Sequence, residues 1–191
     1  MRLDRPWLVL DLGAPHLVAS SAIHRGGRVT AGRIAWREVR DADLGPELDA
    51  VAWFAETLDA AGLGDAVGLV TSRDVRRFRR ARAEIGDVVA DCIATVGLGN
   101  AERVGTRHAP AKFAGTVNVA LRCSAALSEA AHLEALSVAA SARTLAVLEA
   151  GLRTPAGPAT GTGTDCLAVA VPPAGSEPHA RLHMSDTRAE Q

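Results

Sequence analysis

The most unusual stretch of the sequence is a run from Thr160 to Asp165 in which glycines alternate with threonines. Glycine lets a backbone approach a ligand closely, and the hydroxyl and N–H groups supply hydrogen-bond donors. Such a loop can bind an anion or form an oxyanion hole, and it can equally be a flexible connector. It is not a P-loop, because no Gly-Lys-Ser/Thr follows and a strand rather than a helix is expected next.

Two other polar positions could act together with this loop. Asp165 stands where the loop meets the following strand, and a carboxylate there can activate water, orient a hydroxyl or cap its own turn. Asn118 lies inside the apolar segment 115–121, where an amide needs hydrogen bonds. Those bonds can belong to a polar site that opens near Thr116, or to a purely structural network.

The sequence lacks the motifs of several other kinds of active site. The histidines show no zinc-ligand spacing, although His24 and His108, in loops that contain glycine or proline, are weak candidates for a general base. His132 is expected on a helix surface. There is no Gly-x-Ser-x-Gly elbow of a serine hydrolase. Arginines between Arg73 and Arg82 indicate a solvated helix face, or else a docking surface for an acidic partner.

Composition limits the class of protein. The 191 residues are 48% hydrophobic with a formal net charge of -1, which fits a globular domain and argues against a general nucleic-acid binder. No apolar run approaches the ~20 residues that cross a bilayer, and the apolar run that starts at Trp7 is too short for a signal peptide. Three widely spaced cysteines suit a reducing compartment. We therefore expect a cytoplasmic protein with no membrane partner.

The elements that must position these residues follow from periodicity and turn signals. The pattern predicts seven strands, at 7–11, 16–23, 29–39, 66–70, 88–96, 115–121 and 166–171. It also predicts a helix from Pro46 to Gly62 with Leu48, Val51, Ala55 and Leu58 on one face, a second after Ser72, and the longest from Ser128 to Gly151.

Strands and helices mix without strict alternation. This order predicts an α+β fold, a single layered domain over 1–172 in which a mixed or antiparallel sheet packs against helices. Residues 173–191 turn polar and proline-rich, and they are predicted to form a flexible tail.

Taken in order, several segments resemble the adenosylcobinamide amidohydrolase (CbiZ) family, and the likeness extends to about Val171. The segments that carry it are Ser20-Ser21 with Gly26-Gly27, Val67–Thr71 with Asp74–Arg77, Ala94–Asn100, Gly115–Asn118 and Thr160–Asp165. The resemblance implies hydrolysis of the aminopropanol amide of adenosylcobinamide to give adenosylcobyric acid. The cobalt belongs to that corrinoid substrate, so the resemblance requires no cofactor and no protein-bound metal.

An amide hydrolase needs a site that stabilises an oxyanion and supplies a proton to the departing amine. We hypothesise that backbone N–H groups around Thr162–Thr164 do the first, that Asp165 activates water, and that Thr116 or Asn118 orients the carbonyl. The expected binding residues are Ser20, Ser21, Gly26, Gly27, Thr71, Asn100, Thr162 and Gly163. Thr164 completes the catalytic set.

One departure from the family pattern leaves alternatives open. Family members tend to carry a glutamate in the middle of the long helix, where this chain has Ser141 followed by Ala142 and Arg143. A catalytically altered or inactive corrinoid-binding protein is therefore a second interpretation. A third, a basic helix that binds acidic partners, predicts salt-sensitive binding and indifference to corrinoids.

Overall fold

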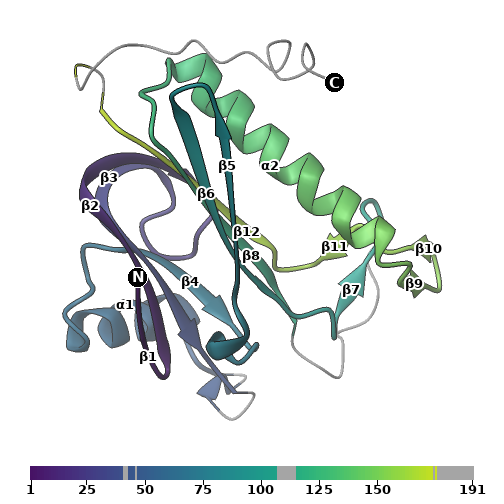
Figure 1. The fold of residues 1–191 in the computed structure, drawn as a ribbon. Coiled ribbons are helices and arrows are strands. Elements are labelled where there is room, and N and C mark those ends of the chain that lie inside the picture. The colour runs from purple at the N-terminus through teal and green to yellow at the C-terminus, as the bar shows by residue number, and fades with distance from the viewer. Residues whose placement is uncertain (41–42, 46, 107–114, 174, 176–191) are drawn as a thin grey trace.

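A single mixed sheet forms the body of the protein, as the computed structural model shows (Figure 1). The structure describes residues 1–40, 43–45, 47–106, 115–173 and 175. Seven strands lie in the order β4-β3-β2-β12-β8-β6-β5, and β1 pairs with β2 at one end. Their bounds are β1 Arg2–Asp4, β2 Trp7–Ser20, β3 Gly27–Glu38, β4 Val67–Thr71, β5 Arg79–Ile85, β6 Val88–Val96, β8 Val117–Cys123 and β12 Cys166–Val171. The α+β fold expected from the sequence is confirmed.

The opening strands are antiparallel, but the two strands predicted at 7–11 and 16–23 are one continuous strand, β2. Strand β2 is continuous, and residues 12–15 bulge opposite Gly32, because the register changes between Asp11 and His16. Within the bulge the Gly13 N–H donates to the Asp11 carboxylate at 2.8 Å. Gly13, Ala14 and Pro15, residues typical of a turn, thus form an irregularity inside one long strand.

Each helix connects two strands that lie parallel and adjacent in the sheet. Strands β3 and β4 are joined through α1 (Ala50–Ala60), and β8 and β12 through α2 (Glu129–Glu149). Parallel neighbours need such crossover connections, since a tight turn cannot join them. Ser128 caps α2 and Gly151 follows its end at φ 71°, as predicted. Asp49 caps α1, and Gly62 follows that helix at φ 66°.

The expected inward face of α1 was partly wrong. Phe54 and Leu58 are the buried residues, whereas Val51 is 58% exposed and Leu48 is also exposed. The helix begins at Ala50, so Leu48 lies before it and outside the helical periodicity. Pro46, expected near its start, lies outside the described residues.

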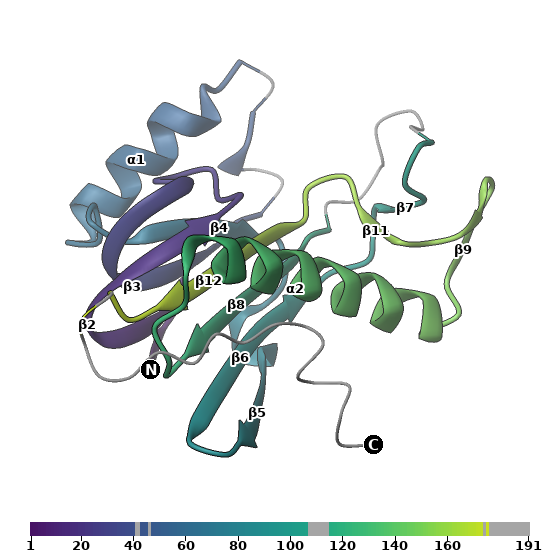
Figure 2. The ribbon, with the colours of Figure 1, turned by 90° about the horizontal axis from the view of Figure 1, so that it is seen from above.

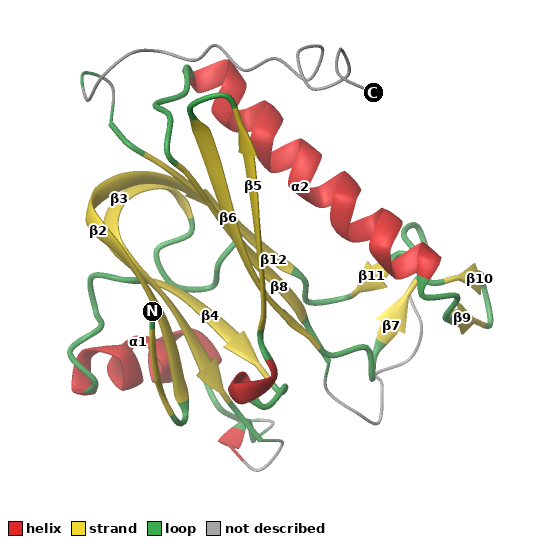
Figure 3. Cartoon of the chain, viewed as in Figure 1, coloured by secondary structure: helices red, strands yellow, loops and turns green. Residues whose placement is uncertain are grey.

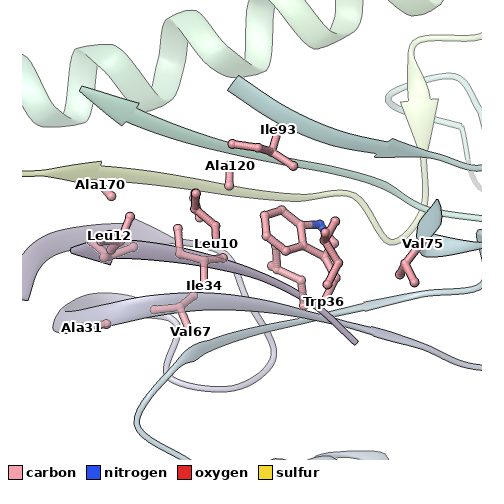
Figure 4. Packing of buried hydrophobic residues seen from close by; sticks show 14 residues of the cluster. Leu10, Leu12, Ala31, Ile34, Trp36, Val67, Val75, Ile93, Ala120 and Ala170 are labelled. Carbon is pink, nitrogen blue, oxygen red and sulfur yellow. The ribbon is translucent and has the colours of Figure 1, made fainter. Parts of the chain in front are cut away.

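The main core occupies one face of the sheet (Figure 4). The sheet curves so that β4 approaches β8. Trp36 is the largest buried side chain there, and aliphatic residues from six strands surround it. The Asn118 side-chain amide on β8 donates to the carbonyl of Val70 on β4 at 2.8 Å. With aromatic residues at only 3% of the chain, small side chains let the strands close on one another.

Both helices pack against the opposite face. Phe54 and Leu58 of α1 contact Val9 and Ala35, and α2 lies along β12 (Figure 2). The surface position expected for His132 was wrong. It is 2% exposed and its Nε2 bonds to the Val169 carbonyl at 2.8 Å.

The predicted second helix does not form. A short 3₁₀ turn, η2 (Val75–Arg77), leads into strand β5, which pairs with β6 in a hairpin that turns at Gly86 with φ 54° (Figure 3). Alternation fits the segment as well as helical spacing does, since Arg80, Arg82 and Glu84 alternate with small or apolar residues. The hypothesis of a basic helix is therefore wrong. Separately, no helix among the described residues is long and apolar enough to span a membrane.

Candidate active site

The glycine–threonine loop lies beside the start of β8, as the sequence hypothesis required. Strands β8 and β12 are parallel, with Cys166 opposite Asn118. The segments that precede the two strands therefore meet at the amino-terminal ends of these strands. Strand β11 (Gly161–Thr162) also pairs with β7 (Ala101–Glu102). The Thr160 N–H donates to the Glu102 carbonyl at 2.8 Å, which fixes the loop on its other side.

Asp165 holds the loop together. Its Oδ1 accepts from the Val117 N–H at 2.9 Å and from the Thr162 hydroxyl. Its Oδ2 accepts from the Thr162 N–H at 2.9 Å and from the Arg143 guanidinium on α2. Two donors on each oxygen occupy the lone pairs that a carboxylate offers. The geometry therefore does not support Asp165 as the base that takes a proton from water, and it indicates a positioning role.

The hydroxyl groups of the site form a directed chain. Thr164 Oγ1 donates to the Gly115 carbonyl at 2.9 Å, so it accepts from Thr116 Oγ1 at 2.7 Å. A carbonyl oxygen is too weak a base to activate an alcohol, so Thr164 is not prepared as a nucleophile. Thr116 keeps free lone pairs, with which it can accept a hydrogen bond from a ligand.

Two cavities meet at this loop, and Asn100 and Thr164 line both. The larger, about 1070 Å³, is polar and is bounded by the loop, Glu102, Arg103 and Arg143. The smaller, about 320 Å³, has an apolar wall with polar groups at one side. Its lining includes Ile23, Val39, Leu44, Trp53, Val70, Thr71, Thr116 and Cys166. The arrangement suits one large ligand with polar and apolar parts.

Glu102 is a candidate that the sequence reasoning missed. A Cβ placed on Gly163 would lie 3.2–3.4 Å from the Glu102 carboxylate, so this carboxylate stands against the loop at the wall of the larger cavity. Among the described residues no salt bridge engages it. No local motif surrounds Glu102, and its pairing with residues nearly sixty positions away could not be read from the sequence.

Asn118 lies below the cavities rather than in their walls. It is 0% exposed, and its amide connects β8 to β4. Its Oδ1 has no partner among the described residues, and neither does the hydroxyl of Thr95 directly opposite on β6. A direct contact with substrate is not what this geometry favours, and the structural network left open above fits better.

The residues expected around the early loop also serve its own geometry. Ser20 Oγ accepts from the Ala22 N–H at 2.9 Å, and Ser21 Oγ accepts from the Leu167 N–H at 3.1 Å. A Cβ on Gly26 would lie 2.3 Å from the Ala22 carbonyl oxygen, and Gly27 has φ 83°. None of the four lines either cavity, although Ile23 between them does. The structure thus separates them from the cleft.

Of the other expected positions, Thr71 and Asn100 line cavities, and so do Thr162 and Gly163. Ser141 is exposed on α2, two residues before Arg143, which faces the loop. Ser141 lines neither cavity, but Thr144 lies one turn further along the same helix face and lines the larger one. A longer side chain at position 141 would therefore extend beside that wall. His24 bonds to the Gly64 carbonyl at 3.0 Å, and His108 lies outside the described residues.

Cys166 lies in the wall of the smaller cavity but is not prepared for attack. Burial raises the pKa of its thiol, and the negative charge of Asp165 acts in the same direction. The thiolate is the nucleophilic form, so a raised pKa keeps Cys166 unreactive near neutral pH. Among the described residues, no group of three or more histidine, cysteine or acidic side chains is arranged to hold a metal ion.

Together, fold and site define a small α+β domain with a two-part ligand cleft at the amino ends of two parallel strands. Comparison with known families makes the assignment specific. The family model for adenosylcobinamide amidohydrolase matches residues 1–185, so the chain belongs to that family. No curated protein matches the chain.

Proposed function

We propose that the protein hydrolyses the amide that joins the aminopropanol arm to the corrin of adenosylcobinamide, giving adenosylcobyric acid and aminopropanol. Family membership supports the reaction class. The observation that carries the proposal is the meeting of the glycine–threonine loop and the start of β8 at two joined cavities. A corrin bears many peripheral amides, which suit the polar lining of the larger cavity. The cobalt arrives with the substrate, and the proposal needs no protein-bound cofactor.

Glu102 is our proposed general base. It would take one proton from water while the oxygen of that water adds to the amide carbon, giving a tetrahedral oxyanion. The N–H group of Gly163 is the proposed donor to that oxyanion, because the Thr162 N–H bonds to Asp165 and the Thr164 N–H is directed to the Thr162 hydroxyl at 3.5 Å. Glu102 would then return the proton to the amine nitrogen, and the C–N bond would break.

The direct test follows the products by mass after incubation of the full chain with adenosylcobinamide. Glu102→Gln should lower kcat by ~10²–10⁴-fold, the usual contribution of a general base, with little change in the melting temperature. Glu56→Gln, at an exposed glutamate on α1, is the matched control and should keep full activity. Unchanged kcat in Glu102→Gln would remove Glu102 as the base. Absence of aminopropanol with the wild-type chain, despite corrinoid binding, would instead support the non-catalytic alternative.

A further inference from the structure

Strand β5 is an exposed edge of the sheet. All seven of its residues are exposed, and among the described residues it pairs only with β6. Figure 2 shows it at the outer margin of the sheet, away from α1. A free edge exposes unpaired N–H and C=O groups and can bind another strand. The side of β5 that does not pair with β6 can therefore bind an additional strand.

An apolar surface continues from this edge onto α2. Ala83 and Ile85 of β5 line a groove of about 300 Å³ together with Val138 of the helix. Ile85 is 50% exposed, Val138 39% and Leu145, seven residues further along the helix, 56%. Residues seven apart share one helix face, so the groove and the helix form one apolar surface that no element of the described part of the chain covers. Surfaces of this kind mark interaction sites.

We propose that this surface binds a second copy of the chain, with β5 pairing antiparallel to its counterpart about a twofold axis at Ala83. In that register Arg82 stands opposite Glu84 of the other copy, twice, and Ala81 stands opposite Ile85. The charge pattern of β5 is thus complementary to that of a second, antiparallel copy of β5, which favours a second copy over an unrelated partner. A register shifted to centre on Ala81 would instead place Arg80 opposite Arg82.

The same twofold axis would also cover the exposed apolar face of α2. Helix α2 lies on the face of the sheet to which Ala83 and Ile85 point. A twofold at Ala83 would place two antiparallel α2 helices on one side of a continuous sheet, with Val138 and Leu145 of each facing the groove between them. The proposal is independent of the reaction, so its failure would leave the proposed function untouched.

A charge-reversal cycle on the full chain tests the interface by analytical ultracentrifugation across concentrations. The wild type should dimerise. Arg82→Glu and Glu84→Arg should each place like charges opposite one another and raise the dimer Kd about tenfold or more. An equimolar mixture of the two variants, and the double variant Arg82→Glu/Glu84→Arg, should dimerise again. Circular dichroism controls for folding, since Arg82 also donates to Glu84 of its own strand at 2.7 Å and lies 3.9 Å from Asp91. Mixing the two variants does not restore the Arg82–Glu84 contact within either chain, so recovery in the mixture reports the contact between chains.

A cross-link tests the register. Ala83→Cys would face its own copy, and directly opposite antiparallel residues are spaced as disulfides require. Oxidation should therefore give covalent dimers with Ala83→Cys and far fewer with Arg80→Cys, with the wild type as the baseline for the native cysteines. A monomeric wild type at high concentration, or a dimer that neither the charge variants nor the cross-link affects, would overturn the proposal.

Discussion

Replacing Asp165 by asparagine separates a structural role of this carboxylate from a catalytic one. Asparagine keeps one acceptor oxygen, so two of the four donors around Asp165 would face an NH₂ group instead. Arg143 would also lose its counter-charge at a position where its side chain is only 19% exposed. We therefore expect Asp165→Asn to unfold more readily than the wild type.

The structure sets the size of this effect. Removing one partner of a buried ion pair costs about 3–5 kcal/mol, and the lower value fits here because Arg143 keeps some contact with water. For a chain of 191 residues, a loss of about 3 kcal/mol lowers the melting temperature by about 7 °C. In an Arg143→Gln background, Asp165→Asn should reduce stability by less, because no arginine charge remains to be left unpaired.

The assay pairs thermal unfolding with steady-state kinetics on adenosylcobinamide at a temperature where the variant is folded. We expect KM to rise, because the loop is less ordered, with kcat within about tenfold of the wild type. A kcat reduced by ~10²-fold or more with an unchanged melting temperature would show that Asp165 acts as the base after all. That result would refute the argument from occupied lone pairs.

Three further predictions concern neighbouring features. Gly161→Ala should weaken both folding and substrate binding, since its Cβ would lie 2.4 Å from Asp165 Oδ2. Gly32→Ala is the control and should be tolerated, because no atom lies within 4 Å of its Cβ. Measurements of the melting temperature and of KM for both variants check this prediction. Asn118→Ala should cost about 1–3 kcal/mol in urea unfolding, because the Val70 carbonyl loses its donor, and lost activity with unchanged stability would contradict that role. Burial and the nearby charge of Arg28 lower the pKa of His132, so the unfolded chain takes up a proton first. Stability should therefore fall as pH drops below about 6.5, and less steeply in His132→Gln, which urea titrations at pH 7.5 and 5 would show.

Much of the fold could be predicted from local patterns. Strands β6 and β12 have the predicted bounds, and the cap residue and glycine at the ends of α2 were identified correctly. The error at β5 has a physical cause, because its residues are all exposed and burial imposes no clear period on an exposed edge strand. Tertiary pairing with β6 decided between helix and strand.

For the candidate site, the meeting of two segments could be predicted from the sequence. The convergence of the glycine–threonine loop with Thr116 followed from the unusual composition of both segments and from the family resemblance. The roles of individual groups were not predictable, because they depend on partners distant in sequence. Asp165 is engaged by Arg143 from α2, and Glu102 reaches the loop only through the β7–β11 pairing.

The wall position of Trp53 gives this protein a built-in optical reporter. The chain has no tyrosine and three tryptophans, of which Trp36 is fully buried and Trp53 lines the smaller cavity. A coloured corrinoid seated in the cleft would lower the tryptophan emission by energy transfer, most strongly that of Trp53, while a shift of the emission to longer wavelength would report the exposure of Trp36 on unfolding. Occupancy and loss of structure can thus be followed as separate signals in one titration, without any attached dye.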